Sequence, residues 1–279
     1  VRVTNYRHAF HAGNFADLHK HTALVALLEA LQRKEKGFLY LDTHAGRGAY
    51  DLARSPEGRT TAPALDRILA GGETPSELAR YARAIAEWRK LSANARGYAG
   101  SPVIAASVLR PQDRAVLIER EPEEAQALAA ALTPRCGVSV VEADGLERLR
   151  AYLPPPERRG LTLIDPPYEA EGELQRVESA VAEALRRFAT GVVAVWYPIK
   201  QASDTAQWHA RMRQRLAHEI LLSELWIHPC DSRVALNGSG LLIVNPPYRI
   251  GERMRAWLPA LLAALDAQRS GGTRVEMLV

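Results

Sequence analysis

The sequence predicts an α/β fold built on a doubly wound, largely parallel sheet of about seven strands, the last of them antiparallel. Short apolar runs alternate along the chain with segments of helical periodicity, which is the pattern of parallel strands joined by helices. The middle runs are almost continuously apolar, as expected for strands that are buried on both faces. The last two runs are joined by a turn-rich connector without a helix, which predicts an antiparallel pair.

The predicted strands and helices follow one another in a regular order. The apolar runs that we assign to strands are residues 38–42, 115–119, 138–142, 161–165, 191–196, 219–227 and 240–245. The segments that we assign to helices are residues 121–132, 145–152, 171–188, 203–217 and 251–268. The tail, TRVEMLV, fits either a further strand or a frayed end.

A long segment between the first and second predicted strands does not fit this alternation. Residues 76–91 carry apolar side chains at helical spacing, and an earlier helix is expected at residues 62–71, where two glycines end it. We therefore predict a small helical subdomain at residues 53–99, inserted into a main domain that comprises residues 1–52 and 100–279.

Basic residues of the second inserted helix can lie together. Arg80, Arg83 and Lys90 share one face, with Glu87 among them. On this pattern alone a solvated face is favoured over a nucleic-acid contact. The net charge of +4 and the pI of 9.2 fit a polyanionic partner, but they fit a slightly basic enzyme with a small substrate equally well.

Cysteine usage and hydropathy predict the compartment. The two cysteines, Cys136 and Cys230, form no metal-binding or redox pair motif, which favours a reducing environment. No apolar run approaches the ~18 residues of a membrane span. The first residues have no uninterrupted apolar core of the kind that a signal peptide needs. We therefore expect a cytoplasmic protein that does not enter a membrane.

Two motifs of similar sequence, LIDPPY (163–168) and LIVNPPY (242–248), each follow an apolar run. In an open α/β sheet, ligands bind beyond the carboxyl ends of the parallel strands. The strand before Asp165 is predicted to be parallel, so its carboxyl end lies at that rim. The strand before Asn245 is predicted to be antiparallel, so Asn245 would lie at the opposite rim. We predict a site at the first motif and a strand-ending turn at the second.

The first motif can activate an exocyclic amine. Such an amine is a poor nucleophile, because its lone pair is delocalised into the ring. The Asp165 carboxylate and the Pro166 carbonyl can both accept hydrogen bonds from it, and the Tyr168 ring can stack on the base. A strand-ending turn with a surface tyrosine is the alternative, which we disfavour because of the position in the sheet.

Residues after the first three predicted strands form the cofactor-binding half of the predicted site. The loop after the first strand has Gly46 and Gly48, but Asp51 replaces the third glycine of GxGxxG, and no GK[ST] follows, so it is not a phosphate-binding P-loop. Glu119 ends the second strand, where an acid can accept hydrogen bonds from ribose hydroxyls. An Asp-Gly pair, at 144–145, follows the third strand within reach of an adenine ring.

Histidines gather near the start of the chain. They are His8, His11, His19, His21 and the more distant His44. Two of them with Asp17 could be drawn as a metal site, but no HExxH pattern or partner cysteine supports it. We predict no metal, and substrate or cofactor contacts are favoured.

Taken together, these segments resemble the RlmJ family of large-subunit ribosomal RNA adenine-N6 methyltransferases. The resemblance spans nearly the whole chain, and the segments that carry it are YRHAFHAGNFADLHKHT, FLYLDTHAGRGAYDL, GSP, ADG, RRGLTLIDPPYE and FATGVVAVWYP. It implies a Rossmann-like class I methyltransferase with a helical insertion, S-adenosylmethionine as cofactor, and methylation of one adenine of 23S ribosomal RNA.

The resemblance also implies roles for individual residues. The expected cofactor contacts are His21, His44, Gly46, Ser101, Glu119, Asp144, Gly145 and Asp165. The expected catalytic residues are Asp165, Pro166 and Tyr168. The expected substrate contacts are Tyr6, Lys20, Tyr168, Arg80, Arg83 and Lys90, the first two in an N-terminal motif that moves over the site in the family.

The implied reaction begins with extrusion of the adenine, which costs least in a loop or single strand. We therefore expect the substrate to be protein-free or partly assembled 23S rRNA. We expect the protein to be a monomer. Two alternatives stay open: a DNA adenine-N6 methyltransferase with the same motif, and a non-catalytic RNA- or DNA-binding protein on the same fold. The first alternative is distinguished by which nucleic acid accepts a methyl group. The second is distinguished by whether the protein binds S-adenosylmethionine.

Overall fold

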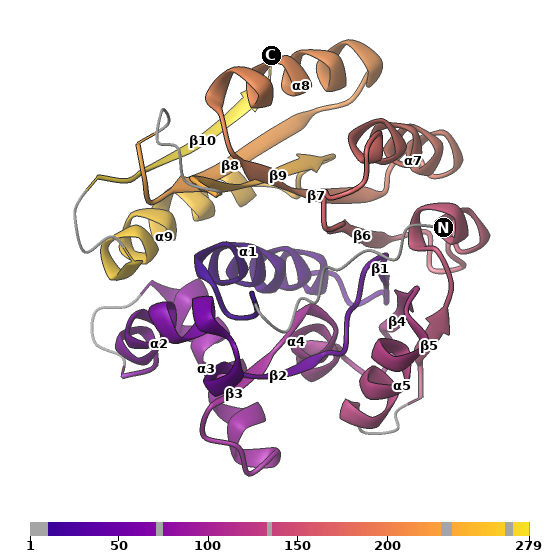
Figure 1. Ribbon diagram of the computed structural model, residues 1–279. Coiled ribbons are helices and arrows are strands. Elements are labelled where there is room, and N and C mark those ends of the chain that lie inside the picture. The colour runs from indigo at the N-terminus through magenta and orange to yellow at the C-terminus, as the bar shows by residue number, and fades with distance from the viewer. Residues whose placement is uncertain (1–10, 71–74, 133–135, 230–235, 266–269, 279) are drawn as a thin grey trace.

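The computed structural model describes residues 11–70, 75–132, 136–229, 236–265 and 270–278, in which an eight-stranded sheet carries helices on both faces (Figure 1). Its strand order is β10-β8-β9-β7-β6-β1-β4-β5. The strands are β1 (Leu39–Asp42), β4 (Arg114–Glu119), β5 (Val138–Glu142), β6 (Gly160–Ile164), β7 (Val192–Ile199), β8 (Ile220–Trp226), β9 (Gly238–Val244) and β10 (Gly272–Leu278). A small second sheet pairs β2 (Ala49–Asp51) with β3 (Gly97–Ala99).

Helices cover both faces of the large sheet. They are α1 (Phe15–Gln32), α2 (Pro56–Leu69), α3 (Ser76–Leu91), α4 (Ser101–Val108), α5 (Pro122–Ala131), α6 (Gly145–Arg148), α7 (Glu173–Arg187), α8 (Ala202–Arg215) and α9 (Ile250–Leu265), with 3-10 turns η2 (Leu52–Arg54) and η3 (Leu149–Ala151). Alternate strand residues face two separate cores, as the pleat requires. Tyr40 packs in the core shared with α1, α4 and α9, whereas Leu39 and Leu41 pack in the core shared with α7 and α8.

Strand directions confirm the predicted α/β class. The strands from β5 through β4, β1 and β6 to β7 are parallel, whereas β9 runs antiparallel to both of its neighbours, β7 and β8. The reversed strand is therefore inserted between β7 and β8 rather than lying at the edge. The tail, which the sequence left open, forms β10, and this eighth strand pairs antiparallel with β8 at the edge of the sheet.

Helix α1 is absent from the predicted elements, although it lies at the centre of the molecule (Figure 1). It contacts α3, α4, α9 and β9, and it is buried continuously from Phe15 to Leu28. A helix that is enclosed on all sides has no polar stripe, so a search for an amphipathic pattern does not find it. Its start has a sequence signal, because the Asn14 side chain accepts a hydrogen bond from the Asp17 N–H at 3.0 Å.

The predicted insertion contains α2 and α3. Helix α2 begins at Pro56, earlier than expected, because the Ser55 hydroxyl caps it by accepting from the Gly58 N–H at 2.9 Å. Both helices pack against α1 or α9 and share their core. The boundaries of the subdomain, at residues 53 and 99, stay a prediction. The two glycines expected to end the first helix, at 71–72, lie outside the described residues.

The two PPY motifs lie at opposite rims of the sheet, as strand direction predicted. Asn245 follows the antiparallel β9, and its backbone N–H donates to the Glu219 carbonyl just before β8. Its side chain donates to the carbonyls of Ala189 and Gly191, at 2.8 Å each, just before β7. Asn245 thus ties together the amino ends of two strands, far from the rim that carries Asp165. None of the helices described here is long and apolar enough to cross a membrane.

We expect Asn245→Ala to lower the free energy of unfolding by ~1–3 kcal/mol, because two carbonyl partners are lost. The residue also has a positive φ of 52°, which asparagine tolerates better than alanine. Urea denaturation followed by circular dichroism measures the change. Tyr248→Ala is the matched control, since this side chain is 82% exposed, and it should change stability by less than ~0.5 kcal/mol. Equal effects of the two variants would contradict the assignment.

Candidate active site

The carboxyl ends of the parallel strands bring acidic side chains from distant parts of the sequence to one rim. Asp42 ends β1, Glu119 ends β4, and Asp165 follows β6. Backbone hydrogen bonds join the loops at this rim: the Thr43 N–H donates to the Leu163 carbonyl at 3.1 Å. The predicted order of site residues therefore produces one cluster, at the position where ligands bind in open α/β sheets.

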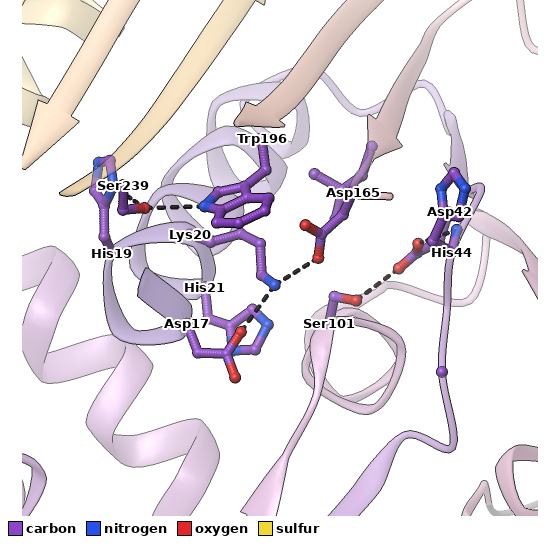
Figure 2. A network of polar contacts seen from close by, with 12 residues as sticks. Asp17, His19, Lys20, His21, Asp42, His44, Ser101, Asp165, Trp196 and Ser239 are labelled. Atoms are coloured by element: carbon purple, nitrogen blue, oxygen red, sulfur yellow. Dashed lines mark hydrogen bonds and ion pairs between the residues drawn. The ribbon is translucent and has the colours of Figure 1, made fainter. Parts of the chain in front are cut away.

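Lys20 joins helix α1 to this cluster. Its Nζ lies 2.5 Å from Asp165 Oδ2 and 2.8 Å from Asp17 Oδ1 (Figure 2). The exposed fractions are 5% for Lys20, 3% for Asp17 and 15% for Asp165. Burial opposes the charge of the ammonium, but the two carboxylates outweigh it and raise the pKa of Lys20 above its usual range. Lys20 is therefore a cation that is shared between a helix residue and the predicted catalytic carboxylate.

The sequence singled out Lys20 only through the family resemblance, and Asp17 only as part of a rejected metal site. The i,i+3 spacing of Asp17 and Lys20 was the available signal, since such residues are neighbours on a helix. That signal does not reveal that both side chains are buried. Only the tertiary structure shows that Asp165 is the second carboxylate partner of Lys20.

Asp42 is a buried acid that the sequence placed at the end of a strand but not among the site residues. Its Oδ2 accepts hydrogen bonds from the hydroxyls of Tyr40 and Ser101, at 2.7 Å each, and Oδ1 accepts from the His44 N–H at 3.2 Å. Burial raises the pKa of Asp42 to about 6, although these hydrogen bonds partly oppose the rise. Asp42 thus holds the start of the glycine loop against the start of α4.

The glycine loop is fixed by Glu119. The Gly46 N–H donates to Glu119 Oε2 at 2.7 Å, and the Glu121 N–H donates to Oε1 at 2.8 Å. Gly46 has φ +61°, and a Cβ there would lie 2.4 Å from the Tyr50 hydroxyl oxygen, so glycine is required on both counts. Burial raises the pKa of Glu119. Each carboxylate oxygen retains a lone pair for a further donor.

His44 lies half-buried on the same loop. Burial lowers its pKa to about 4, so the imidazole is neutral at pH 7 and can accept a hydrogen bond. Its Nδ1 is 2.8 Å from Thr43 Oγ1. His21 has a different environment, because its ring stacks on Tyr98 with centroids 5.7 Å apart and Nδ1 lies 2.8 Å from the Tyr98 hydroxyl. The expected cofactor contact of His21 stays a prediction.

The pair Asp144 and Gly145 follows β5. Asp144 caps α6 by accepting from the Glu147 N–H at 3.2 Å, and its other oxygen pairs with Arg176 at 2.7 Å. A Cβ on Gly145 would lie only 1.8 Å from the Thr43 carbonyl oxygen. Packing of two loops therefore explains this glycine, and the expected cofactor contacts of both residues stay predictions.

The turn after β6 is rigid. Pro166 is buried, and Tyr168 adopts φ 55° with its hydroxyl donating to the Trp196 carbonyl at 2.6 Å. The ring of Tyr168 lies 5.8 Å from that of Trp196, tilted by 52°. Tyr168 is thus tethered at its hydroxyl and half-buried, in contrast to the exposed tyrosine of the second PPY motif.

Other predicted residues lie apart from this cluster. Arg80, Arg83 and Lys90 are exposed on α3, and Arg80 is paired with Glu29 of α1. Tyr6 lies outside the described residues. Within the described ranges, no group of three or more His, Cys, Asp or Glu side chains could hold a metal ion.

The chain is similar to known proteins over nearly its whole length. The family model described as RsmJ, "Ribosomal RNA large subunit methyltransferase D, RlmJ", matches residues 35–279. The chain is 38% identical over 278 residues to ribosomal RNA large subunit methyltransferase J of Haemophilus influenzae, with 99% of each chain covered. It is also 38% identical over 279 residues to the Escherichia coli protein of the same name, again with 99% coverage of both. A crystal structure of a Legionella pneumophila protein is similar at a TM-score of 0.84 and 36% identity, covering 95% of this chain and 98% of that one.

The buried ion pair of Lys20 and Asp165 leads to a prediction about stability. We expect Lys20→Met to lower the free energy of unfolding by ~3–5 kcal/mol at pH 8, because two buried carboxylates lose their cation. The folded variant should then bind a proton at this carboxylate pair more tightly than the unfolded chain does. This extra proton binding stabilises the folded variant at low pH, and the stabilisation disappears as the pH rises. The drop in the free energy of unfolding caused by Lys20→Met should therefore be smaller at pH 5 than at pH 8.

Urea denaturation at pH 5 and pH 8 measures this difference. Lys90→Met is the matched control, because Lys90 is exposed on α3, and it should change stability by less than ~0.5 kcal/mol at either pH. An equal loss for Lys20→Met at both pH values would refute the coupling between the two carboxylates.

Proposed function

The chain belongs to the RlmJ family of ribosomal RNA large subunit methyltransferases, and from this premise we propose that it uses S-adenosylmethionine to methylate the N6 amine of one adenine in 23S rRNA. The observation that carries the proposal is the position of Asp165. It lies in a rigid DPPY turn at the same rim as the glycine loop and Glu119, and it is held there by a buried lysine.

The residues at the rim fit an adenosine-type cofactor. Glu119 has oxygens with spare lone pairs, which suits ribose hydroxyls, and it holds the glycine loop beside them through the Gly46 N–H. S-adenosylmethionine supplies an electrophilic methyl group when it is bound. The residues proposed to hold it are His21, His44, Gly46, Ser101, Glu119, Asp144, Gly145 and Asp165.

Asp165 and Pro166 are proposed to activate the amine. The carboxylate and the Pro166 carbonyl accept its two N–H groups, which returns lone-pair density to nitrogen. The nitrogen lone pair would then face the methyl group that bound S-adenosylmethionine would supply. The methylated nitrogen then loses a proton, for which Asp165 is the acceptor.

Lys20 bonds Asp165 Oδ2, and we propose that it moves away from this oxygen as the amine binds. Asp17 lies 2.8 Å from the same ammonium, so Lys20 keeps one carboxylate partner when it gives up the other. An unpaired buried charge would cost several kcal/mol, and this arrangement avoids that cost. The exchange explains how a strong ion pair is consistent with a substrate site.

The substrate is proposed to be an adenine extruded from protein-free or partly assembled rRNA. Extrusion costs a few kcal/mol and is easiest from a loop or single strand. Tyr168 supplies a ring on which the base can stack. Arg83 and Lys90, which are exposed on α3, are proposed RNA contacts, together with Arg80 once its pairing with Glu29 is broken.

Substrate identity is tested by incubation with labelled S-adenosylmethionine and either protein-free rRNA or duplex DNA. Label on rRNA, mapped by mass spectrometry to N6-methyladenine, supports the proposal. Label on DNA alone favours a DNA adenine methyltransferase, since the DPPY chemistry serves either substrate. Failure to bind S-adenosylmethionine in calorimetry favours a non-catalytic binding protein.

We expect Asp165→Ala to reduce turnover by at least ~10²–10⁴-fold while S-adenosylmethionine still binds, because the amine loses its carboxylate and the other proposed cofactor contacts remain. Turnover of rRNA and calorimetric binding of the cofactor measure the two effects. Asn245→Ala is the matched control, as the aspartate and the asparagine begin equivalent motifs at opposite rims. Retained turnover in the Asp165 variant would remove this residue from the mechanism.

The double substitution Arg83→Ala/Lys90→Ala should weaken RNA binding and reduce the slope of log K against log salt by ~0.7 per lost phosphate contact to a single strand. Fluorescence anisotropy at several salt concentrations measures the slope. Arg213→Ala is the control, since it is exposed on α8, at the other end of the molecule from α3 (Figure 1). A slope identical to wild type would exclude this helix face from the interface.

A further inference from the structure

We propose that Trp196 contacts the extruded purine as a second aromatic surface of the site, and that Ser239 and His19 are positioning residues that hold its ring. The inference rests on the proposed function and deepens it, because it names how the base is held. Trp196 and Ser239 were not among the predicted site residues, and His19 was named only as one of the histidines favoured as substrate or cofactor contacts.

Trp196 lies beside the reacting carboxylate. It is in β7, adjacent to β6, and it is half-buried, with its ring on the side of the sheet that faces α1. Lys20 Nζ is 5.7 Å from the centre of the indole and 2.5 Å from Asp165 Oδ2. Figure 2 shows the indole next to the lysine and the carboxylate, with Asp165 beyond the ammonium. A base whose amine reaches Asp165 therefore has this ring as a neighbour.

A chain of hydrogen bonds below the indole fixes its plane. Trp196 Nε1 donates to Ser239 Oγ at 3.0 Å, and Ser239 Oγ lies 2.9 Å from His19 Nδ1. His19 Nε2 lies 3.1 Å from Ser223 Oγ, on the next strand. The four side chains belong to β7, β9, α1 and β8. An indole anchored to Ser239 of β9, and through it to His19 of α1, loses little freedom when a base binds.

His19 links the two serine hydroxyls of this chain. It is fully buried, and burial lowers its pKa to about 3, so the ring is neutral with one N–H and one acceptor nitrogen. One ring nitrogen therefore donates to the serine that it faces, and the other accepts from the second serine. His19 thus acts on the site through Trp196 and does not itself touch the base.

The two aromatic rings of the site are coupled. The hydroxyl of Tyr168 donates to the backbone carbonyl of Trp196, so the position of one ring depends on the other residue. Their planes are tilted by 52°, so a planar base can stack in parallel on only one of them and meets the second ring by an edge. Such a pair orients a base in two directions, which places its amine at Asp165.

The test compares wild type with Trp196→Leu, Trp196→Phe, Ser239→Ala and the matched control Ser223→Ala. The control also deletes a hydroxyl bonded to His19, but on the side away from the indole. Turnover of an rRNA fragment gives KM and kcat, and calorimetry gives the affinity for S-adenosylmethionine. A fragment with 2-aminopurine at the methylated position reports base stacking without any methyl transfer.

For Trp196→Leu we expect KM for RNA to rise by about 10- to 100-fold, with cofactor affinity within about 2-fold of wild type. At saturating enzyme the 2-aminopurine fluorescence should be higher than with wild type, since a stacking partner is lost. Trp196→Phe should raise KM by about 3- to 10-fold, because a smaller aromatic ring remains. Ser239→Ala should raise KM by a similar factor, because the indole remains but is less constrained. Ser223→Ala should stay within about 2-fold.

Wild-type values of KM, kcat and 2-aminopurine fluorescence in Trp196→Leu would overturn the inference while leaving the proposed function intact. If that variant fails to fold, unchanged KM in both Trp196→Phe and Ser239→Ala overturns it. Equal KM changes in Ser239→Ala and Ser223→Ala would show a merely structural network and overturn the positioning role. Absence of adenine methylation by wild type, with the cofactor bound, rejects the proposed function instead.

Discussion

The requirement that a buried lysine keep an anionic partner governs the centre of this molecule. Lys20 lies in the enclosed helix α1, where a charge without a partner would be far too costly. Asp17, one turn earlier, and Asp165, in the loop after β6, satisfy it together. Helix α1 and the rim that carries Asp165 are thereby joined by one ionic contact.

Helix α1 contributes side chains to both the polar side and the aromatic side of the rim. Successive residues of α1 point in different directions, so His19 reaches β8 and β9 while Lys20 reaches the loop after β6. The two residues meet again at Trp196, whose N–H belongs to the His19 chain and whose ring lies beside the ammonium. A helix without an amphipathic stripe therefore carries two polar networks into one site.

Strand direction separates two motifs that are alike in sequence. Asp165 and Asn245 both precede two prolines and a tyrosine, yet the first follows a parallel strand and the second an antiparallel one. The asparagine uses its amide to hold two strand ends, so its polar groups are committed to structure. The aspartate has the Lys20 ammonium, from a helix distant in the sequence, as its partner.

The sequence by itself determined the order of the predicted strands and helices, the reversed strand, and the rim at which Glu119 and Asp165 would lie, because apolar periodicity and the type of connection between strands are local properties. It did not reveal α1, since uniform burial removes the contrast on which periodicity depends. Asp42, Asp17, Trp196 and His19 acquired their places only from the tertiary structure. Their partners lie on other elements, so the energy that fixes them arises from burial and contact between segments that are distant along the chain.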